Sequence, residues 1–378
     1  MKKKDDFIIV TLFILFIYGI VCANILTVDK EFSEMENRML TQKPQFILGD
    51  ILSGDYMEEY ETYITDQFVA RDMFVGIKSA GERTLGKKEN NGVYYGKDGY
   101  LIEQLESVDE ALVKRNAEAV KRFADCTQAE VAFALIPGSV ELNRDKLFEF
   151  MPDLNQKEMI DTIYGSMLDS KIICADMYKS LNAHRDEEIY YRTDHHWTSL
   201  GAYYGYCAFA EAMGFAPIEL NEYERELRSE EFYGTLYSKN GAFWLEPDSI
   251  FTYVDAEGIV VERIEGNVTE KGELYDLSKL AGKDKYSMFL GGNQPLVVLK
   301  TENTELPKLL VIRDSYSDSL APFLTAHYSE IYMWDFRYNK DSVSDFIEAN
   351  DIEDVFICYS IDNFQEDSNI AFVLSKEQ

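Results

Sequence analysis

The chain has 378 residues, 46% of them hydrophobic, so it can bury a large core and is longer than one typical domain. Its 37 Lys and Arg against 68 Asp and Glu give a formal charge of -31, which argues against a nucleic-acid partner, because a phosphate backbone needs a basic binding surface. The five cysteines are scattered and odd in number, and they indicate neither a disulfide framework nor a zinc–thiolate site.

The amino terminus carries a localisation signal. Three lysines, Lys2 to Lys4, precede an uncharged stretch from Phe7 to Leu26. At about 1.5 Å per residue, this stretch can cross roughly 30 Å of hydrocarbon. The lysines favour a cytoplasmic amino terminus, which places the rest of the chain outside. We therefore predict a signal anchor over residues 1–26 and a single-pass protein of the cell membrane, with cleavage near Val21-Cys22-Ala23 as the alternative.

Residues 27–105 are predicted to form a helical extension that ends in a hairpin. An irregular link to about residue 50 is followed by helical periodicity over 51–85. Aromatic and β-branched residues over 92–102, around Lys97-Asp98-Gly99, are typical of a hairpin.

Residues 106–378 alternate between helix and strand, which predicts one α/β domain with a mostly parallel sheet flanked by helices. The predicted helices cover 110–125, 157–168, 201–213, 321–327 and 342–350. The predicted strands cover 130–136, 171–174, 309–312, 330–334 and 354–358. Residues 225–300 interrupt this order and are predicted to be an inserted antiparallel segment, with strands over 251–254 and 258–261 on either side of Asp255-Ala256-Glu257.

Asp194-His195-His196-Trp197 gathers two of the four histidines into one tetrapeptide. Histidine exchanges protons near neutral pH without a large pKa shift, so a hydrolytic or acyl-transfer reaction would have few other bases here. Asp194 and His196 stand two apart, so in an extended or tight-loop segment both side chains can leave the same face and form a hydrogen bond. The carboxylate would then fix the imidazole tautomer and stabilise the imidazolium.

Ser315 is the candidate nucleophile for this base. The apolar run Leu309–Ile312 is typical of a buried strand, and the polar residues after it lead into a helix start near Leu320. A strand-to-helix turn exposes a hydroxyl at the carboxyl edge of a sheet and directs backbone N–H groups at the atom it attacks.

Two further strands end in polar residues, Arg337 after 330–334 and Asn363 after 354–358. Ligands of open parallel sheets bind at the carboxyl ends of the strands, so these residues are predicted to line one pocket with Ser315. Arg337 is a candidate for holding a carboxylate or a sugar hydroxyl, with a structural salt bridge as the alternative, and Asn363 is a candidate oxyanion donor.

The run from Tyr191 to Tyr203, with D-H-H-W inside it, resembles the signature of the DHHW proteins, which are similar to AlgX/AlgJ-type polysaccharide O-acetyltransferases. The resemblance covers nearly everything after the anchor. Its further motifs are Glu36-Asn37-Arg38, Asp66-Gln67-Phe68-Val69-Ala70-Arg71, Val93 to Gly99, Phe289 to Asn293, Asp314-Ser315-Tyr316 and Asp335-Phe336-Arg337-Tyr338.

The resemblance implies an SGNH-hydrolase-like (flavodoxin-like) domain and an extracytoplasmic O-acetyltransferase that modifies a cell-surface or exported polysaccharide. Carried onto this chain, Asp194 is the orienting acid, His196 the general base and Ser315 the nucleophile, and Asn363 stands near the place of the oxyanion asparagine. The implied partners are a polysaccharide acceptor and a membrane-bound O-acyltransferase that supplies the acyl donor. No cofactor is implied. The further candidates for oxyanion or substrate binding are Arg337, Tyr316, His195 and Trp197.

Other interpretations remain open for the same residues. A carbohydrate O-acetylesterase would use the same triad with water as the acceptor, and a polysaccharide-binding or assembly protein would keep the fold without the chemistry. Asp194, His196 and Ser315 could form a buried hydrogen-bond network, and Trp197 could be a packing residue. No metal site is predicted, since vicinal histidines rarely direct both imidazoles at one ion and no third ligand is evident.

Overall fold

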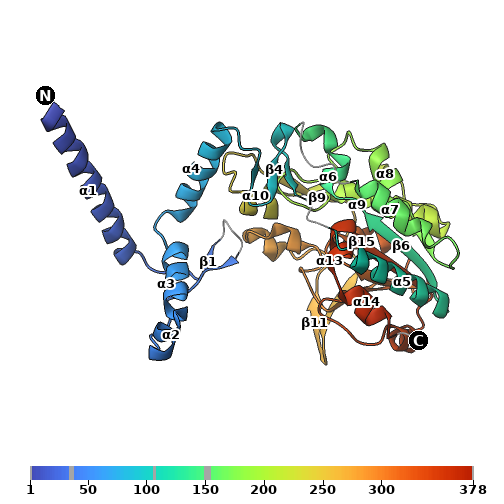
Figure 1. Cartoon of the computed structure of the whole chain (residues 1–378). Helices are drawn as coiled ribbons and strands as arrows, with labels where there is room; N and C mark the ends of the chain where they lie inside the picture. The colour runs from blue at the N-terminus through green and yellow to red at the C-terminus, as the bar shows by residue number, and fades with distance from the viewer. Residues whose placement is uncertain (1, 34–37, 105–107, 149–154, 377–378) are drawn as a thin grey trace. The chain divides into compact units, whose positions relative to one another are not determined.

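The computed structural model describes residues 2–33, 38–104, 108–148 and 155–376 (Figure 1). It divides into two compact units: unit 1 comprises Met1–Asn90 with Ser238–Trp244, and unit 2 comprises Asn91–Tyr237 with Leu245–Gln378. The predicted boundary at residue 105 lies outside the described residues, and the three-part division of the sequence stays a prediction.

Unit 1 begins with the long helix α1 (Lys2–Leu26). By length and composition its part Asp6–Leu26, with a mean hydropathy of 2.6 and none of it buried, suits a membrane span or a signal sequence. The remaining elements are the strands β1 (Phe32–Ser33), β2 (Arg38–Met39) and β3 (Glu89–Asn90) and the helices α2 (Leu48–Ser53), α3 (Asp55–Asp66) and α4 (Arg71–Thr84).

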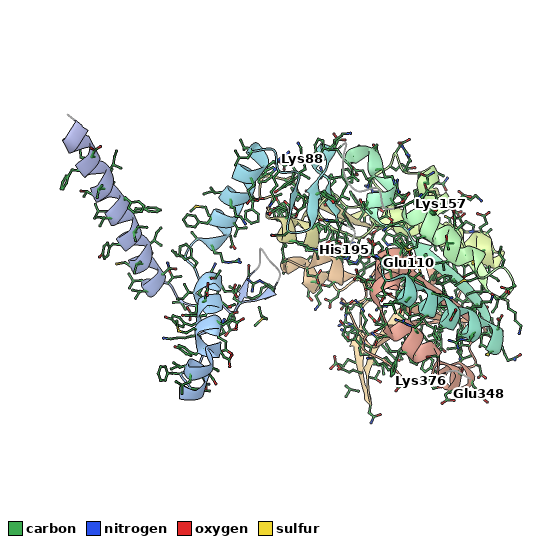
Figure 2. All side chains as sticks on the ribbon, viewed as in Figure 1. Lys88, Glu110, Lys157, His195, Glu348 and Lys376 are labelled. Atoms are coloured by element: carbon green, nitrogen blue, oxygen red, sulfur yellow. The ribbon has the colours of Figure 1, made fainter. Side chains whose placement is uncertain are left out.

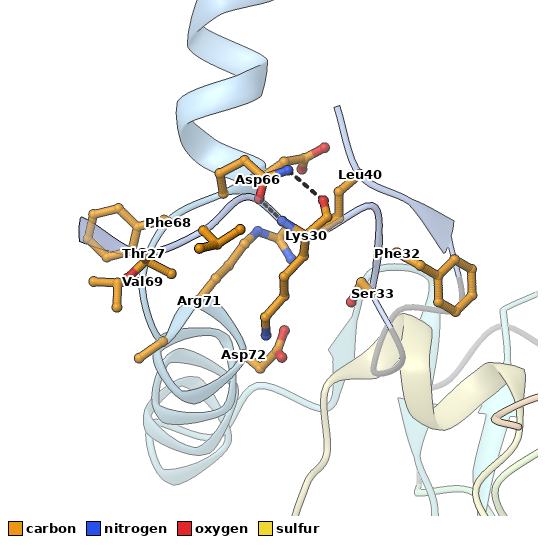
Figure 3. A pocket seen from close by; sticks show the side chains of 13 residues that line it. Thr27, Lys30, Phe32, Ser33, Leu40, Asp66, Phe68, Val69, Arg71 and Asp72 are labelled. Atoms are coloured by element: carbon orange, nitrogen blue, oxygen red, sulfur yellow. Dashed lines mark hydrogen bonds between the residues drawn. The ribbon is translucent and has the colours of Figure 1, made fainter. Parts of the chain in front are cut away.

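The corner between α3 and α4 holds the segment that follows α1. The Gln67 amide accepts from the Lys30 N–H and donates to the Lys30 carbonyl, both at 2.8 Å, while Asp66 accepts two hydrogen bonds from Arg38 at 2.6 and 2.9 Å. The Val69 N–H donates to Asn24 Oδ1 in the last turn of α1 at 2.7 Å. A pocket of about 430 Å³ lies at this corner (Figure 3). The described residues of the motifs Glu36-Asn37-Arg38 and Asp66 to Arg71 therefore hold the end of α1, and the segment that follows it, at this corner. Glu36 and Asn37 lie outside the described residues.

Unit 2 is built on a mixed sheet that has eight strands among the described residues. In spatial order these are β11 (Val268–Gly272), β10 (Val260–Glu265), β12 (Leu296–Lys300), β14 (Glu330–Trp334), β13 (Lys308–Arg313), β15 (Asp354–Ser360), β6 (Glu130–Ile136) and β7 (Ile173–Ala175). The strands from β14 to β7 run parallel, and β12, β10 and β11 extend the sheet antiparallel at one edge.

Helices cover both faces of this sheet, so the central strands are apolar on both sides. Alternate residues of β6 enter different cores: Ala132 and Ala134 face one, Val131 and Phe133 the other. The first core is closed by α8 (Met177–Ala183), α9 (Ser199–Met213) and α11 (Ser317–Leu324). The second is closed by α5 (Glu110–Cys126), α7 (Gln156–Gly165), α12 (Val343–Asn350), α13 (Ile361–Glu366) and α14 (Asn369–Leu374) (Figure 1).

The remaining elements of the chain are short. A hairpin of β4 (Val93–Tyr95) and β5 (Leu101–Glu103) encloses the 3-10 turn η1 (Lys97–Gly99), as predicted, and β8 (Glu226–Phe232) pairs with β9 (Asp248–Thr252). The others are α6 (Ser139–Leu142), α10 (Thr235–Asn240), η2 (Arg144–Lys146), η3 (Leu220–Glu222), η4 (Leu277–Ala281) and η5 (Lys285–Met288).

The predicted α/β fold with flanking helices is confirmed, and one strand pairing is wrong. Residues 251–254 and 258–261 do not pair with each other, because β9 pairs with β8 and β10 pairs with β11 and β12. Alternation along the chain indicates that a segment is a strand, but its partner depends on tertiary packing. The insertion is antiparallel: β10, β11 and β12 extend the main sheet, and β8 and β9 form a separate two-stranded sheet.

Candidate active site

Asp194, His196 and Ser315 form one hydrogen-bonded chain. His196 Nδ1 lies 2.6 Å from Asp194 Oδ1, and His196 Nε2 lies 2.8 Å from Ser315 Oγ. Asp194 and His196 are buried, and Ser315 is partly exposed. The structure thus brings together three predicted residues although 119 positions separate His196 from Ser315. A nucleophile, a base and an orienting carboxylate in this geometry suit acyl transfer.

Asp194 is held as an ionised acceptor. Its Oδ1 also accepts from the His196 N–H at 3.0 Å, and its Oδ2 accepts from the N–H of Thr235 at 2.7 Å and from the Thr235 hydroxyl at 3.0 Å. Burial opposes the charge, but the two neighbouring histidines and these hydrogen bonds outweigh it and hold the pKa of Asp194 well below its usual range. An ionised carboxylate only accepts, so His196 must carry its proton on Nδ1 and offer a bare Nε2 to Ser315.

His196 is kept neutral by its surroundings. Its ring stacks on that of Tyr286, with centroids 3.8 Å apart and planes at 9°, and the Tyr286 hydroxyl donates to the Ser315 carbonyl at 3.1 Å. Burial and the electrostatic effect of the neighbouring His195 lower the pKa of His196 to about 4, against the opposing effect of Asp194. A neutral imidazole is the form that can take the Ser315 proton.

Asp314 organises the turn that carries Ser315. This turn joins the end of β13 to the start of α11. Asp314 Oδ1 accepts from the Tyr316 N–H at 3.0 Å, and its Oδ2 accepts from the Ser360 N–H at 2.7 Å and from Asn363 Nδ2 at 2.8 Å. Because β13 and β15 are parallel neighbours, this one carboxylate ties the Ser315 turn to the end of the next strand.

Arg337 follows β14 and Asn363 lies in the first turn of α13, which follows β15, and each side chain is held by a carboxylate. The Asn363 amide donates one of its hydrogens to Asp314. The Arg337 guanidinium is paired with Asp335 through Nε at 2.9 Å and Nη2 at 2.6 Å, and it remains 35% exposed. The ion pair fits the structural alternative for Arg337, although its side chain still reaches the surface.

Hydrogen bonds of Trp197 and Tyr316 connect the Asp194–Trp197 segment with the turn that carries Ser315. The fully buried Trp197 indole N–H donates to the Tyr316 carbonyl at 2.9 Å and to Ser319 Oγ at 3.0 Å, and the Tyr316 hydroxyl donates to the His195 carbonyl at 2.5 Å. Neither side chain is open to a substrate in this structure, so the packing interpretation of Trp197 fits its position.

The sequence assigns no role to three residues that contact the site. Thr235 holds Asp194, Tyr286 covers His196, and Asp314 orders the Ser315 turn. Only Asp314 carried a local signal, as an acidic residue between an apolar run and the candidate nucleophile. Thr235 lies 41 positions from Asp194 in a segment without a recognisable pattern.

Asp194, His195 and His196 are also close enough to share a metal ion. Their facing atoms are already used, since Asp194 accepts from His196 and Thr235, and His195 Nδ1 lies 2.7 Å from Thr235 Oγ1. This arrangement engages the facing atoms of the three side chains in hydrogen bonds and fits a proton-transfer site better than a metal site.

Comparisons with known proteins agree with this architecture. A structure of a DHHW family protein from Eubacterium siraeum has a TM-score of 0.63 and 26% identity, covering 76% of this chain and 96% of that one. PatB1 from Bacillus cereus has a TM-score of 0.61 at 17% identity, covering 73% of this chain and 98% of that one. The O-acetyltransferase domain of Pseudomonas putida AlgJ has a TM-score of 0.50 at 15% identity, covering 75% and 99%.

Among curated proteins, the probable alginate O-acetylase AlgJ of Pseudomonas syringae is 22% identical over 164 residues, which is 40% of this chain and 41% of that protein. The chain thus matches about two fifths of the length of this relative. The family model described as DHHW protein matches residues 106–334, which is more than half of the chain. The chain therefore belongs to the DHHW protein family.

Proposed function

We propose that this protein is an extracytoplasmic O-acyltransferase that transfers an acetyl group to a hydroxyl of a cell-surface or exported polysaccharide. The observation that carries the proposal is the hydrogen-bonded chain from Asp194 through His196 to Ser315. Similarity to AlgJ, which is named a probable alginate O-acetylase, supports the choice of acetyl transfer.

In the first half-reaction Ser315 Oγ attacks the acyl carbon of the donor while its proton moves to His196 Nε2. The tetrahedral intermediate collapses, the bond from the acyl carbon to the leaving oxygen breaks, and His196 returns the proton to that oxygen. In the second half-reaction a glycan hydroxyl gives its proton to His196 and attacks the acyl-enzyme, and Ser315 Oγ leaves and is reprotonated. Asp194 stabilises the imidazolium that forms in each half.

The oxyanion of each intermediate is assigned to the Ser315 N–H and to Asn363. Within the part of the chain that the structure describes, the Ser315 N–H donates to no acceptor, so it remains available. Asn363 gives one amide hydrogen to Asp314 and keeps a second. Each such donor is typically worth about 3 kcal/mol of barrier reduction.

We further propose that residues 1–26 anchor the protein, that 27–105 form an extension, and that 106–378, with the insertion 225–300, form the catalytic domain outside the cell membrane. The apolar stretch of α1 and the lysines in its first turn support this topology. An acyl donor supplied by a membrane-bound O-acyltransferase would fit such a location.

The test supplies the full chain with an activated acetyl ester and a glycan panel, and it scores transfer and hydrolysis separately. Transfer should exceed hydrolysis when the acceptor is present, and Ser315→Ala and His196→Ala should each abolish transfer. His184→Ala is the matched control, because His184 is bonded to Glu187 outside this site. Full transfer by Ser315→Ala would refute the proposal, and acetate release unaffected by any glycan would make the enzyme an esterase.

A further inference from the structure

His195 is joined to the catalytic carboxylate through Thr235. His195 Nδ1 lies 2.7 Å from Thr235 Oγ1, which lies 3.0 Å from Asp194 Oδ2. The ionised carboxylate only accepts, so the single hydroxyl hydrogen of Thr235 points to Asp194. The Thr235 oxygen must then accept from His195, whose proton therefore resides on Nδ1. In its neutral form the His195 ring then has a bare lone pair on Nε2.

The His195 ring lies beside His196 and is partly open to solvent. The His195 ring packs on that of His196, with centroids 3.9 Å apart, and its side chain is 31% exposed against 7% for His196 and 2% for Asp194. The Tyr316 hydroxyl fixes the His195 backbone through its carbonyl. His195, labelled in Figure 2, is therefore the member of this cluster that a second substrate can reach.

Two acidic residues are close enough to His195 to interact with it electrostatically. Asp284 and Asp362 both interact electrostatically with His195. Partial burial, together with the charges of Glu103 and Glu366, raises the pKa of Asp362 to about 7, and desolvation and Asp194 raise the pKa of Asp284. Surroundings that disfavour the charged form of these two carboxyl groups would also disfavour a charged carboxylate on a substrate. Arg337, the residue predicted as a candidate for holding a carboxylate, is already paired with Asp335.

We infer that His195 recognises the acceptor: its Nε2 accepts a hydrogen bond from a hydroxyl of the glycan, at a sugar that carries no carboxylate. This inference rests on the proposed function, because it assigns the acceptor of that reaction. Among relatives, AlgJ is named for alginate, and the acidic groups around His195 favour a neutral sugar in this protein.

The test measures binding on the full-length Ser315→Ala protein, so that it does not depend on turnover. The ligands are neutral tetrasaccharides, each paired with a uronate tetrasaccharide of the same length and linkage. We expect at least one neutral ligand to bind, with its uronate counterpart at least about tenfold weaker. Adding His195→Asn, whose amide replaces the Nδ1 donor but not the Nε2 acceptor, should weaken binding about tenfold, as for one lost hydrogen bond.

His195→Gln places an amide oxygen near the Nε2 position and should recover most of the affinity, whereas His184→Asn should leave affinity unchanged. Tighter binding of the uronates, no binding of any neutral ligand, or unchanged binding by His195→Asn would overturn the inference. Nitrogen-15 NMR of the histidine rings gives a check without any ligand, since a His195 protonated on Nε2 alone would also overturn it. If the proposed function itself is wrong, the transfer assay, and not this binding measurement, would show it.

Discussion

At the scale of single residues, the site depends on a histidine that its neighbours keep neutral. His196 is buried against Tyr286 and lies beside His195, so its pKa is lowered to about 4 from a usual value of about 6.5. His196, the proposed base, is therefore in its proton-accepting form throughout the mildly acidic range.

This environment predicts the pH profile of acylation. We expect kcat/KM for an activated acetyl ester to fall below a pH of about 4, because kcat/KM reports ionisations of the free enzyme. Pre-steady-state acylation rates across the pH range would measure it. An acidic limb near pH 6.5 would show that His196 titrates as an ordinary histidine.

The same shift has a consequence for stability. Between pH values of about 6.5 and 4 the unfolded chain binds a proton at His196 that the folded chain does not. The free energy of unfolding should therefore decrease as the pH falls through this window. Denaturation of His196→Gln over the same window should show a smaller decrease, and an identical decrease would contradict the assignment.

At the scale of elements, the loop before α10 must approach Asp194 closely. A Cβ at Gly234 would overlap Cβ and Oδ2 of Asp194, although the φ of Gly234 is ordinary. Gly234 is therefore required by space and not by backbone conformation. Its neighbour Thr235 can hold the carboxylate only because no side chain stands at position 234.

Gly234→Ala should accordingly displace Asp194. We expect a loss of acylation rate of at least about 100-fold and a stability cost of about 1–3 kcal/mol from overpacking. Gly165→Ala is the matched control, because nothing lies within 4 Å of a Cβ at that position in α7. Acylation rates and denaturant melts would test both, and a fully active Gly234→Ala would contradict this account of Asp194.

Elements with strong local signals were predictable from the sequence. Strand β6 matches its predicted range, 130–136, because a charged residue precedes an apolar run that Pro137-Gly138 ends. The short helices α8, α13 and α14 carry no long periodic pattern, and they were not predicted.

The candidate site was predictable only in part, for the same reason. The turn at Ser315 and the D-x-H spacing are local patterns, and the structure places them in contact. The contact of Thr235 with Asp194 depends on how the insertion folds back, as does the pairing of β10 with β12. Long-range partners of this kind leave no trace in local spacing.

At the scale of the whole molecule, the proposed topology makes a specific thiol accessible from outside the cell. Cys126, at the end of α5 in unit 2, is exposed, and Cys22 lies within the apolar helix α1. Lipid would shield Cys22 if α1 spans the membrane, whereas Cys126 would face the exterior.

Intact cells that produce the full chain should therefore be labelled at Cys126 by a membrane-impermeant maleimide. Cys126→Ser should lose this labelling while the protein still fractionates with the membrane. Labelling that requires cell lysis would place unit 2 in the cytoplasm and contradict the proposed topology.

The most direct measurement of the central claim is a search for the acyl-enzyme. The protein is incubated with an activated acetyl ester without acceptor, quenched in acid and digested, and the peptide that contains Ser315 is analysed by mass spectrometry. We predict that this peptide gains one acetyl group on Ser315 and that His196→Ala abolishes the gain. An unmodified Ser315, or acetylation of another residue in its place, would contradict the proposed mechanism.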